Sequence, residues 1–224
     1  FDDLYALVRR HYAEATDEYS KNHLRVIENY ISKFVGEGRN ALLWNGPSTI
    51  AAKENFVTFN FQSLLANKNT TVSNAQMFLV MRWLDNEVIK NRDYNQQNGT
   101  DRKIVIVIDE AHVFIDSKHT VALDFMHQLA KRIRKYQGMQ IVITQNLKAF
   151  MGIDELRFKS SAIVNASQYS MIFPMAPDDM NDLYDLYAQS GSINDSEKEE
   201  ILNNGLGEAF LITAPQERCN IRIH

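Results

Sequence analysis

Hydrophobic residues at steps of three and four, the spacing of one face of a helix, run through the first 35 positions and recur in later segments. No Pro or Gly interrupts residues 1–35, which predict a helical segment that ends before Gly36. The same spacing predicts further helices at residues 73–90, 121–136, 178–189 and 196–203. Ser196 and Glu199 form the expected capping box of the last helix.

From residue 36 onward, short apolar runs alternate with these helices, and the polar residues 92–102 predict a loop. The runs predict strands at residues 41–44, 56–61, 103–109, 139–144, 162–173, 208–213 and 219–223. Strands of this kind are typical of a mostly parallel sheet covered on both faces. We therefore expect an α/β fold, with residues 1–35 as an inserted helical segment and residues 36–224 as the core.

Composition narrows the class of protein. The chain has 224 residues, 45% of them hydrophobic, enough to bury a sizeable core. Its net charge of −4 gives no overall basic field, so a DNA contact would need a local patch or another subunit. The single cysteine, Cys219, cannot form an internal disulfide, and no apolar run is long enough to cross a bilayer. We expect a cytoplasmic protein that reaches a membrane only through partners.

Two acids, Asp109 and Glu110, directly follow the apolar run of residues 104–108. Ligands of α/β sheets bind at the carboxyl ends of the strands, so a buried strand would deliver both carboxylates to a nucleotide. One acid could reach Mg²⁺ through water while the other orients an attacking water. The alternative is a pair of solvated acids that end a strand.

A second predicted strand also ends in a polar side chain, Gln145, one strand–helix–strand unit later. Neighbouring parallel strands would place Gln145 beside Glu110, where a neutral amide can contact a γ-phosphate or orient water. The alternative is a turn residue that leaves a strand.

Four cations lie within residues 131–135, at the end of the helix that precedes this strand. Cations complement a helix C-terminus, and a solvated face is the usual explanation of such a run. The functional interpretation is an arginine finger that reaches the nucleotide of a neighbouring subunit, which requires a ring.

Three segments, IVIVIDEAHVFID, AKRIRKYQGMQIVITQN and IVNASQYSMIF, together resemble the conjugative-transfer ATPases of type IV secretion systems. These are the TraC/TraE-like and VirB-type ATPases of the HerA–FtsK branch of P-loop ATPases. The resemblance also includes YISKFVGEGRNALLWNGPS, ENFVTFNFQSL and GLGEAFLITAP, so it extends over nearly the whole chain. DEAH-box helicases share the first motif, but they follow it with a Ser-Ala-Thr strand end where this chain has Ile-Thr-Gln-Asn.

The resemblance implies a RecA-like three-layer sandwich that works as a hexamer and uses ATP with Mg²⁺. It would energise substrate transfer or pilus assembly at the inner face of an envelope channel, with channel proteins as partners and DNA as a transient one. Carried onto this sequence, it implies that Asp109 holds Mg²⁺ indirectly, Glu110 is the general base and Gln145 is the γ-phosphate sensor. Arg134 is the favoured finger, with Arg132 and the nucleotide-binding Lys135 as alternatives.

The phosphate-binding loop G-x-x-x-x-G-K-[ST] of this family does not occur in the sequence. Without its backbone N–H groups and lysine, the β- and γ-phosphates lose their main binding site. We expect that this chain is the C-terminal part of a longer ATPase with a sheet incomplete at its N-terminus. The chain alone should bind ATP poorly and hydrolyse it negligibly.

Two other functions remain open: a DNA-translocating pump of the same branch, and an ATP-independent module that docks onto channel proteins. The acidic balance of the chain gives no sign of the basic pore that a pump requires. A metal site is not indicated, because His112, His119 and His127 do not have the spacing of a closed site. Surface or capping positions are the expected role of these histidines.

Overall fold

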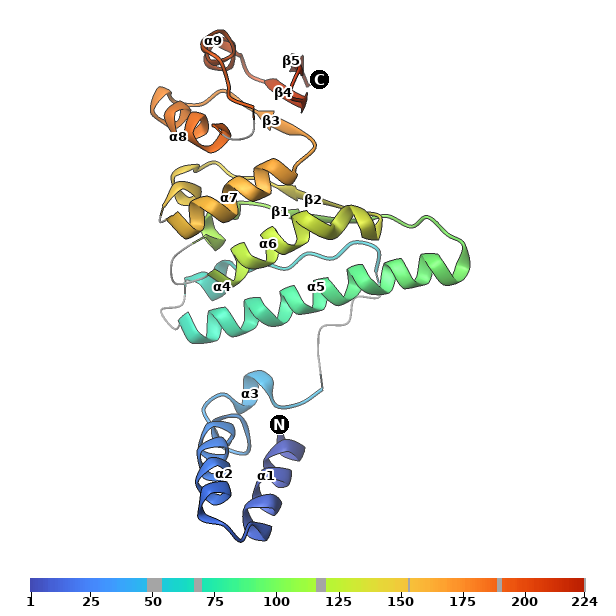
Figure 1. Ribbon diagram of the computed structural model, residues 1–224, viewed down its shortest axis with the longest axis vertical. Helices are drawn as coiled ribbons and strands as arrows, with labels where there is room; N and C mark the ends of the chain where they lie inside the picture. Colours follow the sequence, from blue (N-terminus) through green and yellow to red (C-terminus); the bar gives the residue numbers. More distant parts are fainter. Residues whose placement is uncertain (48–53, 67–69, 116–119, 153, 189–190, 224) are drawn as a thin grey trace. The chain divides into compact units, whose positions relative to one another are not determined.

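The computed structural model describes residues 1–47, 54–66, 70–115, 120–152, 154–188 and 191–223 (Figure 1). The chain divides into two compact units, Phe1–Phe59 and Asn60–His224. A search of the described helices for one that is both long and apolar enough to span a bilayer finds none.

The first unit is helical, as the sequence predicts. Helix α1 (Asp2–Glu14) packs against α2 (Glu18–Ile31), which begins where the Asp17 side chain accepts a hydrogen bond from the Ser20 N–H at 2.7 Å. The short helices η1 (Ser32–Phe34) and α3 (Ala41–Trp44) follow, on either side of Gly36 at φ 54°.

Two predicted strands at residues 41–44 and 56–61 are wrong. Residues 41–44 form the turn of α3, whose Trp44 ring lies 5.5 Å from the Phe34 ring and so packs within a helical layer. Residues 56–61 have no regular secondary structure. Phe56 and Val57 are 87% and 42% exposed, so no buried face selects a strand there.

In the second unit, a pair of parallel strands carries the two polar strand ends predicted from the sequence. Strand β1 (Ile104–Ile108) pairs with β2 (Gly138–Val142) in a register that aligns Ile104 with Gly138 and Ile108 with Val142. The helix between them, α6 (Thr120–Arg132), continues into η3 (Ile133–Tyr136). This strand–helix–strand unit confirms the predicted elements at residues 103–109, 121–136 and 139–144.

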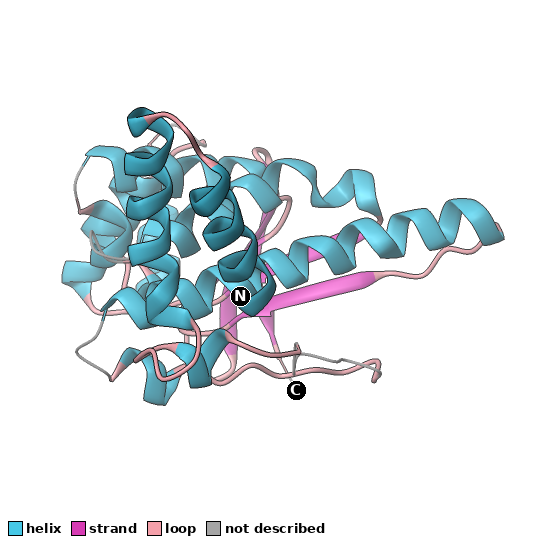
Figure 2. Cartoon of the chain, turned by 90° about the horizontal axis from the view of Figure 1, so that it is seen from below, coloured by secondary structure: helices cyan, strands magenta, loops and turns pink. Residues whose placement is uncertain are grey.

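Helices cover one face of this strand pair and leave the other exposed. Ile106 of β1 packs with Leu129 and Ile133 of the α6–η3 segment and with Val88 of α5 (Thr70–Asn98), and all four are buried. On the opposite face of β1, Val105 and Val107 are 50% and 56% exposed. The expectation of a sheet covered on both faces is therefore wrong for the described residues. Figure 2 distinguishes these helices and strands by colour.

Helix α5 is longer than the sequence predicts. It extends through the polar residues 92–98 that were expected to form a loop, preceded by the short α4 (Gln62–Leu65). Asn95 in this extension is 4% exposed and bonds to the chain that returns toward β1. A buried polar side chain whose hydrogen bonds are satisfied can pack a helical turn against its neighbours without apolar residues.

The C-terminal part forms a second, antiparallel sheet rather than an extension of the first. Its strands β3 (Ser170–Ile172), β4 (Glu208–Ala214) and β5 (Glu217–Arg222) pair in that order, and β4–β5 is the predicted closing pair. Helices α8 (Pro177–Tyr187) and α9 (Asp195–Asn203) share a buried core with β3 and β4. The described strands thus form two small sheets, and the single, mostly parallel sheet expected from the sequence is not seen in them.

Two local predictions in this part need correction. The run at residues 162–173 is divided, because Ile163 and Val164 belong to α7 (Asp154–Ala166) and pack into two different hydrophobic clusters, while only Ser170–Ile172 pair as a strand. The capping box of α9 consists of Asn194 and Glu197, with each side chain 2.9 Å from the other's backbone nitrogen. It lies two residues before the predicted pair.

Candidate functional site

The carboxyl ends of β1 and β2 stay joined beyond the regular ladder. The Ile143 N–H donates to the Ile108 carbonyl at 2.9 Å, and the Ala111 N–H donates to the Ile143 carbonyl at 2.8 Å. Both strand ends are therefore fixed relative to each other at the point where their polar side chains begin. This is the end of the strands at which ligands of α/β sheets bind.

Glu110 has a backbone conformation that side-chain-bearing residues rarely adopt. Its φ and ψ are 49° and 46°, in the left-handed region, and its N–H donates to Oδ1 of Asp109 at 2.9 Å. This conformation costs a non-glycine residue roughly 1–2 kcal/mol and is found preferentially at functional sites. The turn continues into η2 (Ala111–Phe114), whose first residue is fully buried.

Gln145 lies beside Glu110, as the two polar strand ends predicted. Its Nε2 donates a hydrogen bond to Oε1 of Glu110 at 2.7 Å, across 35 residues of sequence. The Glu110 side chain is 41% exposed, so it can be reached from solvent. The predicted neighbourhood of the two residues is confirmed, although their catalytic roles remain predictions.

The other oxygen of Glu110 reveals a residue that sequence reasoning missed. Oε2 is shielded from solvent, with no hydrogen-bond partner among the described residues. Nδ1 of His112 lies 3.2 Å from this oxygen and 3.5 Å from Oγ1 of Thr144. The expectation of a surface or capping histidine therefore does not describe His112, which lies between the two strand ends. The sequence feature that could have indicated this contact is the position of His112 two residues after Glu110.

Asp109 is exposed at the end of β1 and uses Oδ1 to hold the Glu110 N–H. A carboxylate with a further oxygen free of that bond suits Mg²⁺, which is usually held by one or two carboxylates together with waters and substrate phosphates. No cluster of three or more His, Cys, Asp or Glu side chains suited to a metal is found in the described ranges. His127 is buried on α6, and His119 lies outside those ranges.

The predicted finger residues lie at the opposite end of the strands. They precede β2, whose first residue pairs with the first residue of β1, so the length of the strands, roughly 15 Å, separates them from Glu110. Arg132 forms an ion pair with the nearly buried Asp85 of α5. Arg134 and Lys135 are exposed, and Arg134 forms no ion pair with another described residue. Any role in catalysis would thus concern another subunit's nucleotide.

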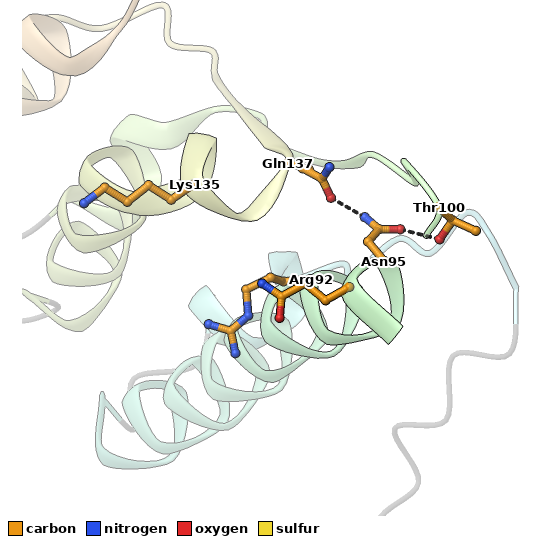
Figure 3. A pocket seen from close by; sticks show the side chains of 6 residues that line it. Arg92, Asn95, Thr100, Lys135 and Gln137 are labelled. Carbon is orange, nitrogen blue, oxygen red and sulfur yellow. Dashed lines mark hydrogen bonds between the residues drawn. The ribbon is translucent and has the colours of Figure 1, made fainter. Parts of the chain in front are cut away.

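Lys135 lines a shallow hollow of about 320 Å³ at this amino end (Figure 3). Asn95 forms one wall: its amide donates to Gln137 Oε1, and its carbonyl accepts from the Thr100 hydroxyl at 2.8 Å. The Lys135 side chain extends away from these groups. Because the amides of this wall are bonded to one another, we interpret the hollow as a structural junction between α5 and the segment that joins η3 to β2.

Comparison with known proteins agrees with the motif-based resemblance. No protein-family model matches the sequence, and no curated protein matches it either. Among solved structures, the chain is similar to VirB4 of Thermoanaerobacter pseudethanolicus, with 25% identity over 99% of this chain and a TM-score of 0.65. The match covers 54% of the VirB4 chain, so this chain spans about half of its length. This likeness supports a relationship of the chain to the type IV secretion ATPases.

Proposed function

We propose that the chain is the C-terminal part of the motor domain of a type IV secretion ATPase, which couples ATP hydrolysis to transfer of DNA or protein, or to assembly of the apparatus. The observation that carries this proposal is the bonded pair of Glu110 and Gln145 beside Asp109, at the carboxyl end of a parallel strand pair. The likeness to VirB4 supports it independently.

In the proposed reaction, Glu110 accepts a proton from the attacking water through a carboxylate oxygen. Asp109 would hold Mg²⁺ through water, and the bound ion would supply positive charge against the phosphates. Gln145 can turn from Glu110 toward the γ-phosphate, because its amide nitrogen donates to a phosphate oxygen as well as to a carboxylate oxygen. The left-handed turn at Glu110 keeps its carboxylate directed across to the end of β2.

In this proposal the full-length protein acts as a ring, and the family resemblance implies that the ring is a hexamer. Arg134 lies at the amino end of the strands, remote from its own Glu110, so it would reach the nucleotide of a neighbouring subunit. Arg132 is the weaker candidate because Asp85 already neutralises it. Lys135 could bind the same nucleotide. The ring would work at the cytoplasmic face of a membrane, held there by channel proteins.

The phosphate-binding loop belongs, in this proposal, to a part of the protein outside the present sequence. The absence of the loop motif from the sequence, and the match to only 54% of VirB4, support this assignment. The chain alone should then show negligible ATP turnover. An ATP-independent docking module is the second candidate, which the same absence and the exposed face of β1 with Val105 and Val107 favour.

The test is ATP turnover by the full-length protein and by its Glu110→Gln variant, with nucleotide binding measured alongside. Loss of the general base should lower kcat about 100-fold or more while ATP binding persists. Glu87→Gln, which removes a half-buried acid of α5 paired with Lys90, is the matched control and should keep full activity. If the full-length protein neither binds nor hydrolyses ATP, the motor proposal fails and the docking module becomes the favoured function.

A further inference from the structure

We propose that His112 is a positioning residue that holds the carboxylate of Glu110 through Oε2 while Gln145 is engaged elsewhere. This inference rests on the proposed function, because it concerns the orientation of the proposed base. It assigns a role to a side chain that the motif-based roles of Asp109, Glu110 and Gln145 do not use.

The geometry of the Glu110 carboxylate leads to this role. Gln145 satisfies Oε1 at 2.7 Å, whereas Oε2 is shielded from water and lacks a hydrogen bond within the described chain. A carboxylate oxygen removed from water without a donor is unfavourable by several times the thermal energy. His112 Nδ1, at 3.2 Å, is close enough to donate after a small rotation of the ring. Catalytic hydrogen bonds are often misaligned in unliganded structures and tighten when substrate binds.

The imidazole is held where it can make this bond. Ala111 anchors the turn, because it is fully buried and its N–H is bonded to the Ile143 carbonyl. The Val113 N–H donates to the Glu110 carbonyl at 2.9 Å, which closes the turn around His112. The His112 side chain is only 26% exposed. An exposed surface histidine would not be restricted in this way.

Thr144 connects the same ring to the end of β2. Its Oγ1 lies 3.5 Å from His112 Nδ1 and accepts a hydrogen bond from the Asn146 N–H at 3.2 Å. The hydroxyl is therefore fixed by the turn that also carries Gln145. His112 thus joins the acidic end of one strand to the polar end of the next by side-chain contacts, in parallel with the backbone bonds.

Two partners of one carboxylate allow a division of roles. When the Gln145 amide turns from Oε1 toward a γ-phosphate, Oε1 becomes free to accept the proton of the attacking water. A carboxylate without another contact would rotate at that moment, and misplacement of a base by about 1 Å lowers the rate substantially. His112 prevents this rotation because its contact is to Oε2, which Gln145 does not use.

The first experiment measures kcat and KM of the full-length protein for three substitutions. The amide nitrogen of Asn is as far along the side chain as Nδ1 of His, whereas that of Gln is one bond further. His112→Asn should therefore keep kcat within about 3-fold, while His112→Ala and His112→Gln lower it about 10-fold or more with KM nearly unchanged. His23→Asn is the control, since within the described residues His23 contacts Tyr19 of its own helix, through the Tyr19 carbonyl and ring.

Equal kcat in His112→Ala and wild type would overturn the inference, as would equal losses in His112→Asn and His112→Ala. A fall in thermal stability that accompanied every loss of activity would also overturn it, because a structural role would then suffice. Rescue by Asn with unchanged stability is the result that a merely structural histidine would not give.

A second experiment separates this inference from the proposed function. Gln145 holds Oε1 in the unliganded chain, so the crystal structures are compared in a Gln145→Ala background, which removes that bond. They should show one position of the Glu110 carboxylate with His112 or with His112→Asn, and several with His112→Ala. A single position in all three overturns the positioning role. If the full-length protein has no ATPase activity but the carboxylate loses its order in His112→Ala, the proposed function fails and the positioning contact stands.

Discussion

The two ends of the β1–β2 pair contain the same unusual feature in different surroundings. Glu110 follows β1 with φ 49°, and Gln137 precedes β2 with φ 57°, and both are non-glycine residues in the left-handed region. At the amino end, the Gln137 side chain bonds to Asn95 and to Asp101. At the carboxyl end, Glu110 keeps one oxygen without a hydrogen bond in the described structure.

This difference indicates what each end contributes. At the amino end, an amide network centred on the buried Asn95 offsets the unfavourable backbone and ties α5 to the strands. At the carboxyl end the strain has less compensation, and the side chains of Asp109 and Gln145 are exposed. Strain that the surrounding structure maintains without local compensation is a property of functional sites. The amino end should therefore determine stability and the carboxyl end activity.

The largest expected effect is from Asn95→Ala, which removes the centre of the amino-end network. The side chain is 4% exposed and makes hydrogen bonds to Arg102, Gln137 and Thr100. Losing them and leaving their partners unpaired should lower the free energy of unfolding by about 3 kcal/mol, measured by chemical denaturation. Asn98→Ala removes an exposed side chain whose bond, in the described part of the chain, goes to the Tyr94 carbonyl of its own helix, and should cost less than about 1 kcal/mol. Equal effects of the two variants would contradict the assigned role of the network.

The next effect is from Gly138→Ala, where β2 begins directly after Gln137. A Cβ at this position would lie 2.7 Å from a carbon of Ile133 and 2.9 Å from a carbon of Ile104, both closer than real contacts allow. Relief of this clash should lower the free energy of unfolding by about 2 kcal/mol. In Gly205→Ala, the new Cβ would approach only the flexible Glu208 side chain at 3.4 Å, so that control should change stability little. A Gly138→Ala variant as stable as wild type would show that the amino end is loosely packed.

A smaller effect compares the two left-handed residues directly. Glu110→Gly relieves the backbone but also removes the bond from Gln145, so it should change the free energy of unfolding by less than about 1 kcal/mol while it abolishes the proposed activity. Gln137→Gly gains the same relief but loses the bonds to Asn95 and Asp101. Its stability should be at least about 1 kcal/mol lower than that of Glu110→Gly. Both free energies of unfolding can be measured on the present chain. A Gln137→Gly variant that is more stable than Glu110→Gly would contradict the comparison of the two ends.

The sequence predicts the two strands and the meeting of Glu110 with Gln145, because unbroken apolar runs that end in polar residues specify both the strands and their orientation. The prediction from sequence fails where the burial of side chains determines the secondary structure. The runs at residues 41–44 and 56–61 have the composition of strands, but in the described structure neither pairs with another strand. Residues 92–98 lack an apolar face, yet the buried Asn95 extends α5 through them.

At the site, local pattern cannot reveal contacts between distant segments. The pairing of Arg132 with Asp85 spans 47 residues, and that of His112 with Thr144 spans 32. The left-handed turn at Glu110 has no sequence signal either, since Glu is not a residue that favours positive φ. These features depend on the packing of α5, α6 and the strands against one another.

The smallest expected effect concerns pH and involves neither end. His127 of α6 is 7% exposed, and its pKa lies below the ordinary value of 6.5 because of burial and the nearby charges of Lys131 and Lys159. The unfolded chain therefore binds a proton at this histidine at a higher pH than the folded chain does, so stability falls as pH decreases below about 6.5. Unfolding measured between pH 8 and pH 5 should show this decline, and His127→Gln should reduce it. Lys159→Met removes one of the charges that lower the pKa, so the decline should become shallower. A decline that is unaffected by His127→Gln would place the pH dependence elsewhere, and the carboxyl end would then be the first region to test.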